Sequence, residues 1–471
     1  MYRVEDRIRR SQGWELVHNG RMAFYNCSLD EAAGRALIRC LRQQANTTTT
    51  VAFTELTFHK CTWDPHPDAL QAFYEFFHMA ATTLQRLVIH TPTLSNSQLG
   101  ALLQPLSSLA ELSMTWSFAR AAASERAAVI HAQAQSLQRL HLRYDGLAFF
   151  AEWNDDLLTA CWPNKLHKLT HLHFQGWNMR NEQLHELMNN IPALPTLQSM
   201  TLEDIRGLTI EGLFKNHSIG RSRADEEEHE RNKNNLQTAQ HDHYYSLQSL
   251  QLLHCRTILS QATEEQLSHW IQKSLRVSNL TIRHCHLPRQ NLRALLRALP
   301  DCHMMIQSIT LQDSSFGQAE LDVLLDILPR LAPVLRHLEI HQLAIALEDD
   351  NDNDNNNDET TTTPHTKRGR LHQLLHALER NTTLTHFVLA GAHGTLDAAT
   401  NDTLRAILQR NRRARNVQRL VVSSSVKGAQ ASTSTKVLIP YALWKLAQEA
   451  PEGCGDMWQL LEQCAGVITG G

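Results

Sequence analysis

One pattern of apolar positions repeats along the chain, and it is clearest between Val277 and Pro300. Leu280 and Ile282 alternate with polar neighbours, as in a half-buried strand. Four leucines then recur at helical spacing: Leu292, Leu295, Leu296 and Leu299. The pattern therefore predicts one strand followed by one helix. Neither element has an apolar face that it can bury alone, so the unit is stable only if copies of it stack on both sides.

Copies of the strand pattern occur along most of the 471 residues. Their central apolar pairs are Met22/Phe24, Leu56/Phe58, Leu87/Ile89, Leu112/Met114, Leu140/Leu142, Leu172/Phe174, Met200/Leu202, Leu250/Leu252, Leu280/Ile282, Ile309/Leu311, Leu338/Ile340, Phe387/Leu389 and Leu420/Val422. These pairs predict about 13 repeats, mostly about 25 to 34 residues apart, a period typical of leucine-rich repeats.

By this repeat length and its Leu-rich helix, the chain resembles the leucine-rich repeat superfamily and, within it, the ribonuclease-inhibitor-like branch. The resemblance covers nearly the whole chain. It implies an α/β fold: a curved leucine-rich repeat solenoid, or horseshoe, with a parallel inner β-sheet and outer helices. It also implies a habit of binding proteins, without naming a partner.

The two ends of the chain depart from the repeat. Asn19-Gly20 lies between two alternating apolar segments and predicts a β-hairpin that covers the first strand edge. Residues 1–20 are therefore expected to be a tail and a capping hairpin strand, residues 21–436 the solenoid, and residues 437–471 a helical cap. The segment from Ile439 to Trp444 is similar to an ending that recurs in leucine-rich repeat proteins of unicellular algae.

Two long gaps between the strands are expected to be disordered inserts. The first, at about 220–245, has almost no apolar residue to offset its ordering entropy. The second, at about 348–370, joins an acidic, Asn-rich tract to a Thr run and the basic cluster Lys367-Arg368-Gly369-Arg370. The tract lacks the central Gly of a calcium loop. The basic cluster is interpreted as a solvated loop edge rather than a nuclear localisation signal.

Composition and cysteine usage bear on compartment and partners. A net charge of -3 gives no overall drive toward nucleic acid or anionic membrane. The nine cysteines are an odd number, and neither a secretory signal nor an apolar run of the roughly 20 residues needed to cross a bilayer is recognisable. We expect a cytoplasmic or nuclear monomer. Four cysteines at one repeat position are expected to be buried thiols that bond to the turning backbone: Cys27, Cys61, Cys255 and Cys285.

No catalytic or cofactor-binding motif is recognisable in the sequence. It contains no phosphate loop, no Gly-x-Ser-x-Gly, no His-Glu-x-x-His and no Gly-x-Gly-x-x-Gly after a strand. The basic run that begins at Arg410 has no accompanying aromatic residues for stacking on bases, so it is interpreted as the solvated end of a helix. Neither an enzyme nor a cofactor, metal or nucleic-acid site is expected.

The function expected from these observations is a non-enzymatic scaffold that binds a protein on the concave face of the solenoid. Two alternatives stay open. The first is a substrate-receptor subunit of a ubiquitin ligase, which would normally carry a helical adaptor-binding module before its repeats. The second is a small-GTPase regulator, which would need a rim Arg or Asn that the sequence does not identify.

Polar residues that alternate with the strand hydrophobes are expected on the concave face, because successive side chains of a strand point to opposite sides. Histidine is frequent among them, and the chain has 27 histidines. The candidate partner-binding residues are Arg139, His141, Arg143, His171, His173, His337, Glu339 and His341. The predicted register places Arg139 beside His171 and His141 beside His173 on adjacent parallel strands.

Three interpretations of this patch remain open. It is a merely solvated polar face, or a zinc site that lacks a carboxylate or thiol to complete it, or an anion-binding surface. The third predicts a partner with an acidic or phosphorylated segment, because Arg and His donate to such groups. If the histidines become protonated below about pH 6.5, that partner binds more tightly at pH 6 than at pH 8.

Overall fold

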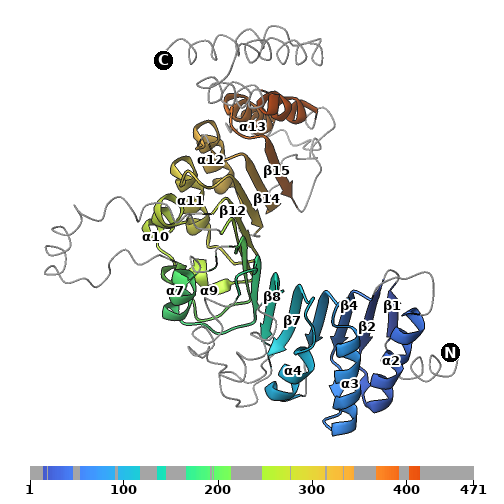
Figure 1. The fold of residues 1–471 in the computed structure, drawn as a ribbon. Helices are drawn as coiled ribbons and strands as arrows, with labels where there is room; N and C mark the ends of the chain where they lie inside the picture. The colour runs from blue at the N-terminus through green and yellow to red at the C-terminus, as the bar shows by residue number, and fades with distance from the viewer. Residues whose placement is uncertain are drawn as a thin grey trace, which may run out of the picture. The chain divides into compact units, whose positions relative to one another are not determined.

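A computed structural model shows short parallel strands that alternate with helices (Figure 1). It describes residues 14–17, 20–45, 53–90, 94–116, 135–144, 166–190, 194, 196–213, 247–275, 277–312, 316–332, 334–343, 368–391 and 402–413. The chain divides into two compact units. Unit 1 comprises Met1–Ala298 with Thr310–Ser315, and unit 2 comprises Leu299–Ile309 with Phe316–Gly471.

The strands of the main sheet follow one another in chain order. The first, β1 (Trp14–Val17), pairs antiparallel with β2 (Arg21–Tyr25), as the Asn19-Gly20 pattern predicts. Parallel strands then follow: β4 (Glu55–His59), β6 (Arg86–His90), β7 (Glu111–Trp116), β8 (Arg139–Tyr144), β9 (His171–Gln175), β10 (Ser199–Glu203), β11 (Ser249–Leu253), β12 (Asn279–Arg283), β13 (Ser308–Gln312), β14 (His337–Leu343) and β15 (His386–Gly391). Two short strands form a separate parallel pair: β3 (Ser28–Leu29) and β5 (Thr62–Trp63).

The helices occupy the chain between these strands. In unit 1 they are α2 (Glu31–Ala45), α3 (Pro67–Met79), α4 (Asn96–Leu103), α7 (Asn181–Asn190), η2 (Ile210–Leu213), α9 (Arg256–Ser260), α10 (Glu264–His269), η3 (Trp270–Ser274) and α11 (Arg289–Ala298). In unit 2 they are η4 (Leu299–Asp301), α12 (Gln318–Ile327), η5 (Leu328–Arg330), α13 (Arg368–Arg380) and a helix over 402–413. Helices α2, α3 and α4 lie along one face of the neighbouring strands (Figure 1).

The alternation of apolar and polar residues explains which face the helices cover. In β4, Leu56 and Phe58 are fully buried, whereas the alternating residues Glu55, Thr57 and His59 are half-buried. The same pattern recurs in β9, β10 and β11. Burial of the apolar set stabilises the stack, since each large apolar side chain contributes roughly 1.5–3 kcal/mol. The predicted fold class, an α/β leucine-rich repeat solenoid, is therefore confirmed.

The predicted strand pairs from Met22/Phe24 to Phe387/Leu389 all fall on strands. The pair Leu420/Val422 lies outside the described residues, as do the expected cap at 437–471 and the core of both expected inserts. One boundary was wrong. Arg368, Gly369 and Arg370 are the first residues of α13, so they belong to a helix and not to a loop.

A tight turn follows several strands and explains the cysteine positions. Asn26, Lys60, His254 and His284 have positive φ angles of 54°, 53°, 55° and 54°, and a cysteine comes next in each case. Such left-handed backbone turns the chain sharply at the end of the strand.

The four cysteines after these turns bond to backbone carbonyls, as predicted. The sulfur of Cys61 donates to the Phe24 carbonyl at 3.4 Å, that of Cys255 to Leu202 at 3.2 Å, and that of Cys285 to Leu252 at 3.3 Å. Each of these carbonyls belongs to the preceding strand. Cys27 donates to the carbonyl of Tyr25 at 3.2 Å. All four thiols are buried and free of disulfides, so their role is structural.

Candidate functional site

The open face is the face of the sheet that carries the polar members of the strands, opposite to the buried apolar set. Its side chains are arranged by register. Because the strands are parallel and in register, residues at the same position of successive strands are neighbours about 4.8 Å apart. Each position therefore forms a row across the sheet.

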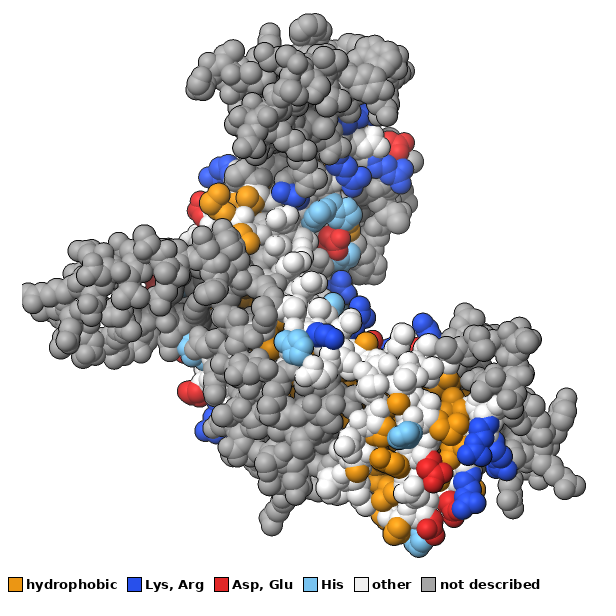
Figure 2. Space-filling view, viewed as in Figure 1, with side chains coloured by type: hydrophobic (Ala, Val, Ile, Leu, Met, Phe, Trp, Pro, Cys, Tyr) orange, Lys and Arg blue, Asp and Glu red, His pale blue; other side chains and the backbone are white. Residues whose placement is uncertain are grey.

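The first row in unit 1 is a charge ladder of five residues: Arg21, Glu55, Arg86, Glu111 and Arg139. Arg21 and Arg86 both contact Glu55, at 3.1 and 3.0 Å. Arg86 also contacts Glu111 at 2.9 Å, and Arg139 approaches Glu111 at 3.9 Å. Figure 2 shows basic and acidic side chains next to one another in this part of the chain. The ladder neutralises most of its own charge.

Sequence reasoning placed Arg139 on this face but did not connect it with the other members of the ladder. The signal was available. Arg and Glu alternate at one strand position in five successive strands, and opposite charges at adjacent positions of parallel strands attract one another. The consequence for Arg139 is that it stands at the end of the ladder, with 59% of its side chain exposed and a single long contact to Glu111.

The predicted register of the histidine patch is confirmed. Arg139 lies opposite His171, His141 opposite His173, and Arg143 opposite Gln175. The rings of His141 and His173 stack with centroids 3.9 Å apart and an angle of 4° between their planes. The structure thus brings the five unit 1 candidates together on β8 and β9.

A carboxylate and a hydroxyl flank the stacked pair. His173 Nε2 lies 3.0 Å from Glu203 Oε2, and Gln175 donates to the other oxygen of Glu203 at 3.0 Å. On the opposite side, Ser113 Oγ lies 3.0 Å from His141 Nδ1. The expectation that no carboxylate lies beside this pair was therefore wrong, since Glu203 comes from the next strand. Even so, the described residues contain no group of three or more His, Cys, Asp or Glu placed to hold a metal ion.

The pKa values of this patch contradict the expected protonation below about pH 6.5. Burial lowers the pKa of His141, and the neighbouring His173 adds to this effect; together they bring the pKa to about 4. Burial also lowers the pKa of His173 to about 4. For His171, burial and then Arg139 lower the pKa. The stacked pair is therefore neutral between pH 6 and pH 8, and it gives no reason for tighter anion binding at pH 6.

The remaining candidates lie on unit 2 and form a second cluster with His386, which was not among the predicted partner-binding residues. Glu339 accepts from His341 at 3.3 Å and from His386 at 2.9 Å, and His386 lies on β15. His337 pairs with His386 across the strands. Burial acts to raise the pKa of Glu339, but the hydrogen bonds from His341 and His386 outweigh it and lower the pKa.

The basic run at the end of the 402–413 helix is more than a solvated helix end. Arg410 Nη2 donates to the carbonyl of Glu379 at 2.7 Å, and Arg412 Nε donates to that of Thr385 at 2.8 Å. Between them, the amide of Asn411 donates to the carbonyls of Asn381 and Leu384 at 2.9 and 2.8 Å. These bonds attach the helix to the chain segment that leads into β15.

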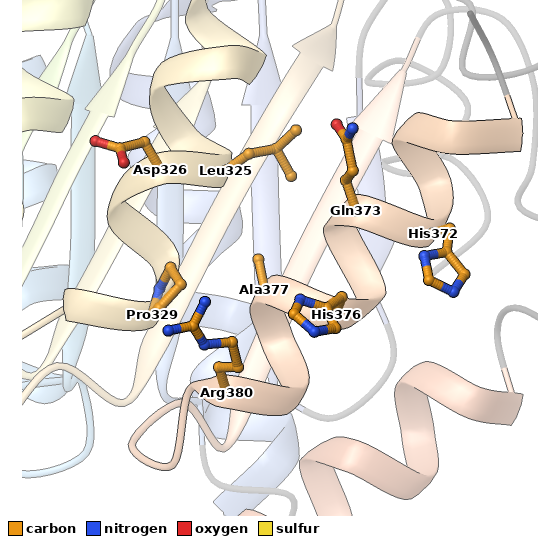
Figure 3. A pocket seen from close by; sticks show the side chains of 8 residues that line it. All are labelled: Leu325, Asp326, Pro329, His372, Gln373, His376, Ala377 and Arg380. Atoms are coloured by element: carbon orange, nitrogen blue, oxygen red, sulfur yellow. The ribbon is translucent and has the colours of Figure 1, made fainter. Parts of the chain in front are cut away.

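A hollow of about 500 Å³ lies on the helix side of unit 2, between α12 and α13 (Figure 3). Its lining residues are Leu325, Asp326, Pro329, His372, Gln373, His376, Ala377 and Arg380. Asp326 is paired with Arg330. The hollow is open to solvent, and its polar groups come mainly from one exposed side of α13. It lacks the convergent polar groups of an enclosed ligand site.

Comparisons with known proteins add little to this description. No family model matches the chain, and no curated protein matches it. Among solved structures, a chain from the crystal structure of the Rad7 and Elc1 complex in yeast is similar, with 13% sequence identity and a TM-score of 0.36. The similarity covers 73% of this chain and 73% of that chain. No helix among the described residues is long and apolar enough to pass through a membrane.

Proposed function

We propose that the protein is a non-enzymatic scaffold that binds a protein partner on the open face of its sheet, centred on β2 to β10 of unit 1. The observation that carries the proposal is the charge ladder from Arg21 to Arg139. Next to the Arg139 end of the ladder, the same face carries the cluster of His141, His173 and Glu203. Regular rows of partly exposed donors and acceptors suit a broad protein surface better than a small ligand.

The charges of the face indicate what kind of partner it suits. Because the ladder pairs its own arginines and glutamates, the face suits a partner of mixed charge rather than a uniformly acidic one. Arg139 at the ladder's end is the residue best placed to receive a carboxylate. At the other side of the face, Tyr25 is 37% exposed and contacts the His59 ring at 5.9 Å. Tyr and Arg are the residue types that most often dominate binding energy at interfaces.

We also propose the subfamily, the oligomeric state and the compartment that the sequence suggests. The repeat length and the Leu-rich helices support the ribonuclease-inhibitor-like branch of the leucine-rich repeat superfamily. A monomer in the cytoplasm or nucleus, without a cofactor, completes the proposed description. The buried free thiols Cys27, Cys61, Cys255 and Cys285 agree with a reducing compartment.

Capture experiments with matched variants test the proposal. The intact tagged chain is incubated with cell extract, and bound proteins are identified by mass spectrometry. A Tyr25→Ala/Arg139→Glu variant is compared with Arg297→Glu, which changes a charge on the exposed side of α11. We expect one protein to be retained by the natural chain and by the α11 variant, and to be lost from the open-face variant.

Retention of every captured protein by the open-face variant would overturn the assignment of this face. A stoichiometric ligase adaptor among the captured proteins would favour a substrate receptor instead. Accelerated GTP hydrolysis by a captured GTPase would favour a GTPase regulator.

A further inference from the structure

Helix α13 carries two histidines one helical turn apart, at the hollow between α12 and α13. His372 and His376 are separated by three residues, and both line this hollow (Figure 3). Residues four apart on an α-helix lie on the same face, with their Cβ atoms about 5–6 Å apart. The helical backbone by itself therefore makes the two imidazole rings neighbours.

The packing of α13 keeps this pair at the surface. Leu374, Ala377 and Leu378 are buried and hold one side of the helix against the rest of unit 2. His372 and His376 lie on the flank of that side, and both are exposed. Neither ring is hydrogen-bonded to another described residue. Their ring nitrogens can therefore receive a ligand from solvent without breaking a contact within the described part of the chain.

The charged groups around the pair offset one another. Arg380 lies one turn after His376, and Figure 3 shows its guanidinium group extending toward Pro329 on α12. Glu379 is exposed and lies three residues after His376, within reach on the same helix. Asp326 supplies a second carboxylate from α12. The surroundings of the two rings therefore carry no excess of positive charge that would repel a cation.

The donor set selects the chemical class of the ligand. Imidazole nitrogen suits zinc, copper and nickel, whereas magnesium and calcium prefer oxygen ligands. Two histidines at positions i and i+4 are also the arrangement by which a His-Glu-x-x-His helix binds zinc, because both rings then reach one ion. Two protein ligands leave the other coordination positions of the ion to water.

We propose that His372 and His376 chelate a divalent transition-metal ion, such as Zn²⁺, on the surface of α13. The described residues hold no group of three or more His, Cys, Asp or Glu placed around a metal ion, so the site is a two-residue chelate rather than a closed structural centre. No metal site was expected from the sequence, because two histidines fall short of a full zinc motif. The site does not depend on the function proposed above.

Hydrogen exchange of the intact chain, followed by mass spectrometry, tests the site where it lies. Metal is first removed with a chelator, and Zn²⁺ is then titrated at pH 7.5, where neutral imidazole is available as a ligand. An ion that binds only the helical form slows the opening of the helix. We expect amides of Arg368–Arg380 to exchange about tenfold more slowly once Zn²⁺ exceeds its dissociation constant tenfold.

Matched variants make the result specific. His372→Asn and His376→Asn should each lose the slowing, because one imidazole cannot chelate. Gln373→His/His376→Gln keeps the number of histidines but places them side by side in sequence, where they do not face each other, and it should lose the slowing too. His78→Asn changes an exposed histidine on α3 and should behave like the natural chain. Mg²⁺ should have no effect on α13.

Exchange of each variant without metal shows whether α13 still forms. If one single variant loosens the helix, the other single variant and the exchanged pair decide. The site is refuted if Zn²⁺ leaves the exchange of α13 in the natural chain unchanged. It is also refuted if the exchanged pair keeps the slowing, or if Mg²⁺ reproduces it, since the effect would then not come from chelation by the two histidines.

Discussion

At the scale of single residues, the neighbour on the next strand decides the properties of a side chain on the open face. Arg86 lies between two glutamates and is paired with both. His141 lies between Ser113 and His173, so its ring is stacked and partly buried. The same register thus gives a compensated arginine in one row and a neutral histidine in the next.

Among the ladder residues, Arg86 is expected to contribute most to the stability of the fold, because it makes two short contacts with glutamates. Replacement by Met leaves Glu55 and Glu111 without their shared partner, although their side chains are only 17% and 26% exposed. We expect Arg86→Met to lower the free energy of unfolding by about 1–2 kcal/mol at low salt, since partly exposed ion pairs are worth about 1 kcal/mol or less each. Urea unfolding measures the loss.

Salt separates the charge effect from lost packing. The difference between Arg86→Met and the natural chain should shrink in 1 M salt, because the screening length falls to roughly 3 Å. Arg405→Met is the matched control, since Arg405 pairs with Asp402 on an exposed helix surface. A deficit that persists unchanged at high salt would show that the ladder does not stabilise the fold electrostatically.

The lowered pKa values of His141 and His173 predict how stability depends on pH. Below about pH 6.5 the unfolded chain protonates these histidines, whereas the folded chain keeps them neutral until about pH 4. The unfolded state then binds more protons, so stability falls as pH drops through this window. We expect each histidine to account for roughly 2 kcal/mol of the loss between pH 7 and pH 5, and the pair for about 3–4 kcal/mol.

Urea unfolding of His141→Gln/His173→Gln at pH 7 and at pH 5 measures this contribution. The double variant should lose less stability between the two pH values than the natural chain does. His372→Gln, which changes an exposed histidine on α13, should keep the natural dependence. An equal pH dependence in the double variant and the natural chain would contradict the lowered pKa values.

The sequence predicted the contacts of these residues better than their charge states. Spacing alone placed His141 opposite His173, because the Leu-x-Leu pattern fixes the register of each strand. Protonation depends on burial, which lowers both pKa values and outweighs the opposing effect of Glu203 on His141. Neither the burial nor the position of Glu203 follows from the spacing of β8 and β9, and the expected protonation near pH 6.5 was therefore wrong.

At the scale of elements, buried polar side chains connect each turn to the one before it. Asn381 is 2% exposed, and its amide donates to the carbonyl of Leu328 at 2.7 Å. Its oxygen accepts from the backbone amides of Thr383 and Leu384 at 3.0 and 2.8 Å. Asn411 repeats the arrangement one turn later. In unit 1, Asn291 donates to the carbonyls of Leu259 and Ala262 in the same way.

Loss of one such side chain should be costly. Asn381→Ala leaves a buried carbonyl, a buried amide and a partly buried amide without their partner, so we expect the free energy of unfolding of unit 2 to fall by about 2–4 kcal/mol. Hydrogen exchange of the β14 and β15 amides measures the effect where it arises. Thr382→Ala, at an exposed neighbouring position, is the control. If Asn381→Ala and Thr382→Ala lower the free energy of unfolding equally, the Asn381 side chain does not link the two turns.

Strands and helices could be predicted where the apolar pattern repeats, but not where a single contact sets the boundary of an element. The strands and the thiols after them follow from the recurrence of one pattern. The start of α13 at Arg368 does not, because low-complexity sequence precedes it and no capping signal marks the boundary. The bonds of Asn381 and Asn411 also depend on contacts between turns, for which an isolated Asn gives no sequence signal.

At the scale of the whole molecule, the strand order shows which stretches of sequence the sheet does not use. Strands β10 and β11 pair directly, with Ser199 opposite Ser249 and Glu203 opposite Leu253, although residues 214–246 separate them in sequence. Strands β14 and β15 likewise pair directly across residues 344–367. In repeat proteins the stability comes mainly from each repeat and its contacts with adjacent repeats.

Deletion of residues from either stretch should therefore leave the sheet intact. We expect removal of Gly220–Asp242, or of Asp349–Thr363, to shift the melting temperature by no more than a few degrees, because loop length contributes to stability only logarithmically. A deletion of the same length as the first, Cys255–Val277, removes α9, α10 and η3 behind β11 and β12 and should abolish the cooperative transition. The buried residues that it takes away include Leu259, Leu267 and Trp270. If deletion of Gly220–Asp242 is as damaging as deletion of Cys255–Val277, this segment is part of the folded core, and the direct pairing of β10 with β11 is not sufficient to hold unit 1 together.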